Sequence, residues 1–135
     1  MKKHVALASL LLAAALIWAG CGSDKQNCNL TGLSVFPSSA TADHTAGAPG
    51  NQVQFFAEAV VPKGCMVTGA VCVNCVGQIW TVSDSVDVAI SNNAGDNGTA
   101  TCVGATNGAV TVTATAPAGT NKSQKVSGTA ALICN

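Results

Sequence analysis

The sequence contains no arginine and no tyrosine, and charged residues make up only 9% of its 135 residues. From residue 21 onward it carries four lysines against six acidic side chains, a net charge of −2 with histidine neutral. Because nucleic-acid binders use clustered cations to neutralise phosphates, this composition excludes a nucleic-acid partner. Serine, threonine and asparagine supply the polar surface instead, a composition common in exported β proteins.

The N-terminal apolar segment is too short for a typical membrane-spanning helix. Val5 to Ala19 is 15 residues long, whereas a spanning helix needs about 20. Lys2 and Lys3 precede this segment, and the small residues Ala19-Gly20 end it. A basic start, a short apolar stretch and small residues at a cut site are typical of a secretory signal.

Cys21 indicates which type of secretory signal the chain carries. A cysteine directly after a small pair resembles the bacterial lipoprotein signal, in which that cysteine is lipidated and becomes the new N-terminus. This resemblance implies a signal peptide over residues 1–20, a lipidated Cys21 and a polar spacer that ends at residue 29. Trp18 stands where such signals usually carry Leu, Val or Ile, so an ordinary secretory signal and an uncleaved anchor remain as alternatives. Gly22 resembles outer-membrane sorting signals, so we expect an exported lipoprotein of the cell envelope, held in the outer membrane.

The cysteine count agrees with a lipidated Cys21. Seven cysteines are an odd number for an exported protein, but assigning Cys21 to the lipid leaves six. An even set in an oxidising compartment predicts three structural disulfides and requires neither a metal nor a cofactor. The six cysteines are Cys28, Cys65, Cys72, Cys75, Cys102 and Cys134.

Apolar and polar residues alternate along the rest of the chain, which predicts half-buried β-strands. Val110, Val112 and Ala114 alternate with threonines, and Asn97-Gly98 and Asn107-Gly108 favour tight turns. We therefore predict one all-β domain over residues 30–135, an antiparallel sandwich of seven or eight strands. The other alternating segments are residues 33–35, 53–59, 80–82, 86–90 and 130–134. The predicted core comprises Phe55, Trp80, Val82, Val88 and Val112.

Five short motifs follow one another in an order that resembles the group-2 bacterial immunoglobulin-like domains, over about residues 30–134. The resemblance implies an immunoglobulin-like sandwich in a surface setting, often for adhesion or spacing, with no catalytic residues. The motifs are Leu33-Ser-Val-Phe-Pro37, Val53-Gln-Phe-Phe-Ala57, Ile79-Trp-Thr-Val-Ser-Asp84, Val86-Asp-Val-Ala-Ile-Ser91 and Gly108-Ala-Val-Thr-Val-Thr-Ala114.

A disulfide hypothesis follows from strand direction in such a domain. If the first strand pairs antiparallel with the second, Cys28 lies beside the segment of residues 62–77. We therefore expect Cys28 to bond Cys72 or Cys75, Cys65 to bond the other, and Cys102 to bond Cys134. This is one of 15 possible pairings of six cysteines.

The Cys72-Val-Asn-Cys75 motif also permits other chemistry. A redox pair normally has its first cysteine at a helix N-terminus, where the pKa of the thiol is lowered, but a strand pattern follows here. A zinc site could use Cys65, Cys72 and Cys75 with a fourth ligand. Haem attachment would need a histidine where Val76 stands. Structural disulfides are favoured, with the redox pair as the main alternative.

Other polar residues are better explained by structure than by chemistry. His44 has no accompanying nucleophile motif and is expected in an exposed loop. Asp84 and Asp87 are expected to mark a turn, and the segment of residues 92–98 lacks the acidic spacing of a calcium loop. Phe36 is the aromatic most expected at the surface, so the sequence offers little material for a carbohydrate site.

These observations predict a non-catalytic cell-envelope lipoprotein whose immunoglobulin-like module serves binding, adhesion or structural support. The expected partners are the membrane, through the lipid, and an envelope protein or a surface glycan. Two alternatives come from other classes: a thiol-disulfide protein that uses Cys72 and Cys75, and an accessory subunit of an envelope complex.

Overall fold

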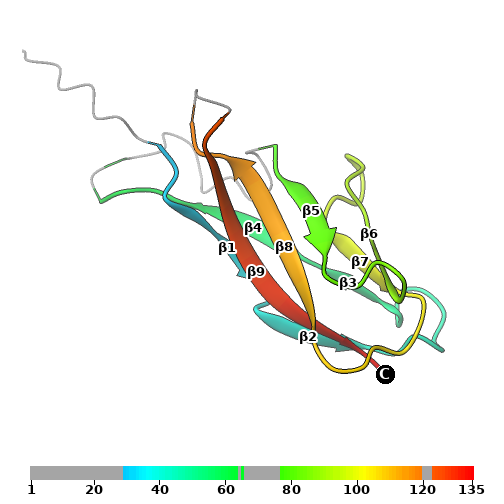
Figure 1. Cartoon of the computed structure of the whole chain (residues 1–135). Helices are drawn as coiled ribbons and strands as arrows, with labels where there is room; N and C mark the ends of the chain where they lie inside the picture. Colours follow the sequence, from blue (N-terminus) through cyan, green and yellow to red (C-terminus); the bar gives the residue numbers. More distant parts are fainter. Residues whose placement is uncertain (1–28, 64, 66–76, 120–122) are drawn as a thin grey trace, which may run out of the picture.

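A computed structural model describes residues 29–63, 65, 77–119 and 123–135. The predicted signal peptide, Cys21 and the spacer up to residue 28 lie outside these ranges. Within them the protein is all-β and contains no helix, as the alternation predicted. The described residues form nine strands (Figure 1): β1 Gly32–Phe36, β2 Ser39–Ala42, β3 Gln52–Gln54, β4 Phe56–Val60, β5 Ile79–Val82, β6 Val88–Ile90, β7 Thr99–Cys102, β8 Val110–Pro117 and β9 Lys125–Cys134.

Strands β8 and β9 form the longest ladder in the described structure. They pair antiparallel from Val110 opposite Leu132 to Pro117 opposite Lys125, and Figure 1 shows them side by side. On β8 the valines and alanines point inward and the threonines outward, so the predicted period of two is confirmed. Strand β5 pairs with β8 and strand β2 with β9, which completes a four-stranded sheet in the order β2–β9–β8–β5.

The remaining strands form two small sheets, which are joined by a single residue of the chain. Strand β1 pairs antiparallel with β4, and β7 lies between β3 and β6. Only Phe55 separates β3 from β4, and its backbone N–H donates to the carbonyl of Gly98 at 2.9 Å. The chain therefore passes directly from the three-stranded sheet into the two-stranded sheet.

The chain changes sheets at Pro37. Strand β1 before it pairs with β4, whereas β2 after it runs parallel to β9 with Ser39 opposite Ala131. Proline has no backbone N–H and cannot donate to a ladder, and β1 ends at Phe36, directly before it. The parallel strand β2 was not predicted.

The core lies between the four-stranded sheet and the two smaller sheets. Its largest fully buried side chains are Trp80, Phe55, Leu132, Val88 and Val112. Of the five predicted core residues, four are therefore fully buried, while Val82 is half-buried and packs against the cluster. Burial of large apolar side chains removes hydrocarbon from water and supplies the main driving force for this packing.

One predicted strand is shorter than expected. Val86 is 81% exposed, and β6 begins only at Val88. The carboxylate of Asp84 accepts hydrogen bonds from the backbone N–H groups of Val86 and Asp87, at 3.0 and 3.2 Å. A side chain that binds the backbone two residues on forms a turn in place of a ladder, so the prediction that Val86 belongs to the strand is wrong and the prediction of a turn is confirmed.

Candidate functional site

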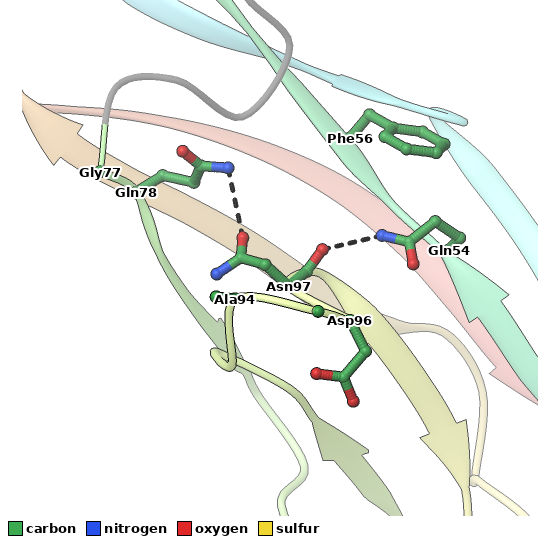
Figure 2. A pocket seen from close by; sticks show the side chains of 8 residues that line it. Gln54, Phe56, Gly77, Gln78, Ala94, Asp96 and Asn97 are labelled. Carbon is green, nitrogen blue, oxygen red and sulfur yellow. Dashed lines mark hydrogen bonds between the residues drawn. The ribbon is translucent and has the colours of Figure 1, made fainter.

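A polar cavity of about 380 Å³ opens beside the ends of β3, β4 and β5. Figure 2 shows the amide side chains of Gln54, Gln78 and Asn97 directed toward one another, with the ring of Phe56 above them. Gly77, Ala94, Gly95 and Asp96 complete the lining. The cavity thus combines neutral hydrogen-bonding groups with one aromatic ring, while the Asp96 carboxylate points away from the amides and accepts the hydroxyl of Ser91 at 2.6 Å.

Asn97 is the centre of the hydrogen bonds around this cavity. Its side-chain oxygen accepts the indole N–H of Trp80 at 2.7 Å and the amide N–H of Gln78 at 3.3 Å. Its backbone carbonyl accepts the amide N–H of Gln54 at 2.8 Å. An amide oxygen has two lone pairs, so these bonds fix which end of the Asn97 carboxamide is nitrogen.

Gln54 is held on both sides. Its nitrogen also donates to the carbonyl of Phe55 at 2.9 Å, and its oxygen accepts the hydroxyl of Thr99 at 2.6 Å. Both amide hydrogens of Gln54 therefore have acceptors within the protein. The wall of the cavity is fixed by these bonds before any ligand arrives.

The side chain of Asn92 hydrogen-bonds the backbone of Trp80 in the way that a neighbouring strand would. Its side-chain oxygen accepts the N–H of Trp80 at 2.7 Å, and its side-chain nitrogen donates to the carbonyl of Trp80 at 3.0 Å. A carboxamide carries the same donor and acceptor as a peptide group. Trp80, the second residue of β5, is thereby bonded on the side away from β8.

Gly98 allows the turn to approach the core. It has φ of +85°, and an added Cβ would lie about 3.0 Å from the Trp80 indole and still closer to the carbonyl oxygen of Phe55. Positive φ is readily adopted by glycine, and the missing side chain permits the contact. The predicted tight turn at Asn97-Gly98 is confirmed, and its second role is to place Asn97 under the indole.

Cys102 and Cys134 form the disulfide expected in the sequence analysis. Their Cα atoms lie 5.6 Å apart, within the usual range for a disulfide. Both residues are 1% exposed, and they join β7 of the three-stranded sheet to β9 of the four-stranded sheet. The bond therefore crosses the core and ties together its two sides.

The other cysteines are described only in part. Cys65 is buried and disulfide-bonded. Cys28, Cys72 and Cys75 lie outside the described residues, so the remaining expected pairings and the redox alternative stay predictions. Among the residues that the structure describes, no group of three His, Cys, Asp or Glu side chains is arranged to hold a metal ion.

His44, which was considered from the sequence, and its neighbour Asp43 lie in the loop that follows β2. His44 is half-buried, and both its ring Nδ1 and its backbone N–H contact the carbonyl of Asn135, the latter at 3.0 Å. Asp43 accepts the hydroxyl and the backbone N–H of Thr45, at 2.7 and 2.9 Å. These two bonds, the hydroxyl first, lower the pKa of Asp43 below its ordinary value of 3.8.

No protein-family model matches the chain, and no curated protein matches it in sequence. Within the described ranges, no helix is long and apolar enough to cross a membrane. The immunoglobulin-like resemblance and the function that it implies therefore stand as proposals, argued from this chain's own residues.

The cavity was not predicted from the sequence, although four of its lining residues lie in the segment of residues 92–98. Phe36 is 49% exposed as expected, but Phe56 is also exposed, at 42%. The doublet Phe55-Phe56 was the available signal: within an alternating segment, two adjacent aromatics point to opposite faces. No local pattern connects Gln54 with Asn97, because they are 43 residues apart.

Proposed function

We propose that the protein is a non-catalytic module of the cell envelope, an immunoglobulin-like β-sandwich held at a membrane by a lipid on Cys21. Its role is to bind a partner at the envelope surface, in adhesion or structural support. The basic and apolar start of the chain, the small pair before Cys21 and the polar spacer support the anchor.

The strand arrangement supports the immunoglobulin-like part of the proposal. Strands β1–β4 and β3–β7–β6 lie on one side of the core and β2–β9–β8–β5 on the other. The N-terminal strands contribute to both sides, and the buried tryptophan of β5 belongs to the same core cluster as the disulfide. A buried tryptophan and an inter-sheet disulfide are features of immunoglobulin-like sandwiches.

The single observation that carries the proposal is the buried Cys102–Cys134 disulfide across the core. Structural disulfides form and persist in exported proteins, whereas reducing compartments keep thiols free. A disulfide between two fully buried residues has no access for thiol exchange, so its role is structural. It supports an exported scaffold, whereas the thiol-disulfide alternative depends on Cys72 and Cys75 and is tested separately below.

The anchor is tested by expressing the wild-type chain and the Cys21→Ser variant in a Gram-negative host fed a labelled fatty acid. The wild type should incorporate label and fractionate with the outer membrane, while Cys21→Ser should lose both properties and Cys28→Ser should keep them. Equal labelling of the two Cys variants, or no label on the wild type, would contradict the proposed anchor.

The non-catalytic role is tested by intact mass after thiol alkylation, with and without reduction. Six alkylated thiols should appear only after reduction. Free Cys72 and Cys75 in the unreduced protein, together with reductase activity on a disulfide substrate such as insulin, would instead establish the thiol-disulfide alternative.

A further inference from the structure

Two phenylalanines face each other on the outer surface of β1 and β4. Phe36 and Phe56 are directly opposed in the antiparallel register, and both remain substantially exposed. Opposed residues on neighbouring strands share a face of the sheet and lie within contact of each other. Together they form an apolar surface that continues to the rim of the polar cavity, because Phe56 also lines that cavity.

The size of the cavity suits a small ligand. Its volume of about 380 Å³ lies near the lower end of the range of about 300–1,000 Å³ that is usual for ligand sites. Gly77, Ala94 and Gly95 place almost no side-chain volume against it. A compact ring can therefore enter to the depth of Asn97.

Asn97 offers two hydrogen-bond donors to such a ligand. Its side-chain oxygen is occupied by Trp80 and Gln78, whereas its NH₂ group makes no hydrogen bond with the described residues. Figure 2 shows this carboxamide between Gln78 and Ala94, at the floor of the cavity. Because its orientation is fixed from behind by the indole, the donors are held in place before binding, which reduces the ordering that a ligand must impose.

We propose that this cavity binds a neutral sugar unit of a surface glycan, with the pyranose ring against Phe56 and its hydroxyls on Asn97. A pyranose has an apolar C–H face and an edge of hydroxyls, which match the ring of Phe56 and the amide donors of Asn97 in the cavity lining. Asp96 is a residue of the lining, and its carboxylate accepts the hydroxyl of Ser91 at 2.6 Å. Its negative charge beside the cavity disfavours anionic ligands such as uronic acids. Phe36 extends the apolar wall for a second sugar unit.

This inference rests on the proposed function, since it names the partner of the envelope module. The two can fail separately: loss of the lipid anchor would leave sugar binding intact, and absence of sugar binding would leave the anchor and the disulfides in place.

The experiment is a titration of the purified, isotope-labelled full chain, followed by NMR of its side-chain amides and indole. Cellotriose, mannotriose and tri-N-acetylchitotriose serve as neutral probes, and trigalacturonate as the anionic one. The detergent must carry no sugar headgroup. A titration to about 10 mM detects dissociation constants of about 1 mM. The Trp80 indole N–H is the reporter, because it bonds the same carboxamide whose donors the sugar would use.

Two variants locate the site. Asn97→Asp keeps an oxygen for the Trp80 indole but removes both donors, and Asn107→Asp makes the same change in the exposed Asn107-Gly108 turn. Phe56→Ala removes the ring from the cavity, and Val103→Ala shortens another exposed apolar residue. At least tenfold weaker binding is expected for Asn97→Asp and Phe56→Ala, with binding unchanged for Asn107→Asp and Val103→Ala.

At least one neutral trisaccharide should shift the Trp80 indole signal, and trigalacturonate should bind more weakly. The proposal is overturned if no neutral probe shifts that signal, if the anionic probe binds more tightly, or if binding survives both Asn97→Asp and Phe56→Ala. Retention of the dispersed spectrum in each variant separates a lost site from a lost fold.

Discussion

The β8–β9 pair and the cavity end of β5 are held by different kinds of hydrogen bonds. From Val110 to Pro117 the two long strands are joined residue by residue through their backbones. Around Trp80, by contrast, the indole bonds the side chain of Asn97, and the backbone N–H and carbonyl bond the side chain of Asn92. The first region is held mainly by backbone bonds. Strand β5 also pairs with β8, but the indole and the backbone groups of Trp80 depend on particular side-chain amides.

The difference predicts how each region responds to substitution. Every non-proline residue carries a backbone donor and acceptor, so an outward-facing position of β8 can change without loss of a ladder bond. A side-chain bond disappears with the residue that makes it, and a buried partner is then left unsatisfied. Substitutions at the cavity should therefore lower stability more than substitutions at outward-facing positions of β8.

The largest effect is expected from Trp80→Ala, at the centre of the side-chain-bonded region. Trp80 is 1% exposed and the largest buried side chain of the core. Removing a buried aromatic leaves a cavity and should lower the free energy of unfolding by about 3–5 kcal/mol. Urea denaturation measures this, with Thr81→Ala on the exposed face of the same strand as control. Equal midpoints for the two variants would contradict the placement of the indole.

Next in size is the disulfide that joins the two regions. Replacing both Cys102 and Cys134 by alanine releases a link between residues separated by 32 positions. Loss of a cross-link of this length should lower the free energy of unfolding by about 2–4 kcal/mol, because the unfolded chain regains freedom. Urea denaturation of the oxidised wild type and the double variant measures this loss.

Comparing the double variant with the reduced wild type separates the effect of this disulfide from the effect of the other cysteines. Reduction of the wild type should lower its stability by at least as much as the double substitution does. If the double variant is as stable as the oxidised wild type, the bond is absent from the folded protein in solution.

The most direct test of the comparison pairs Asn97→Ala with Thr113→Ala. The first removes the acceptor of a buried indole N–H and should lower the free energy of unfolding by about 1–3 kcal/mol. The second removes an outward-facing side chain from the backbone-bonded sheet and should change it by less than about 0.5 kcal/mol. Thermal melts of the two variants measure the contrast, which fails if Thr113→Ala is the more damaging.

The same contrast explains how far the sequence alone could lead. The strand around Val110, Val112 and Ala114 was predictable, because burial on one face imposes a period of two on the residues themselves. The core position of Trp80 followed from the same pattern. Val86 was misassigned because alternation continues across a turn that the Asp84 carboxylate closes, and a capping bond does not alter hydropathy.

The cavity could not be predicted because its residues come from separate segments. Gln54, Gln78 and Asn97 are unremarkable polar residues in their own segments, and only the pairing of β3 with β7 brings the first and last together. Strand β2 escaped notice for a related reason. Its Ser-Ala-Thr-Ala sequence has little apolar contrast, and its parallel partner β9 lies about 90 residues away.

The smallest expected effect concerns Asp43, a side-chain-bonded residue in the loop that follows β2. Hydrogen bonds from Thr45 lower the pKa of Asp43 in the folded protein, so the folded state binds a proton less readily than the unfolded state. Its contribution to stability is therefore fully present above the ordinary value of 3.8 and is lost as the pH falls through the lower folded pKa. Melting temperatures of the wild type and Asp43→Asn should differ slightly at pH 5 and converge as the pH falls below about 4, because the asparagine side chain does not titrate in this range. If the difference in melting temperature widened on acidification, the bonds from Thr45 would favour the protonated form of Asp43. This loop would then differ from the cavity, where each side-chain bond depends on the particular group that makes it.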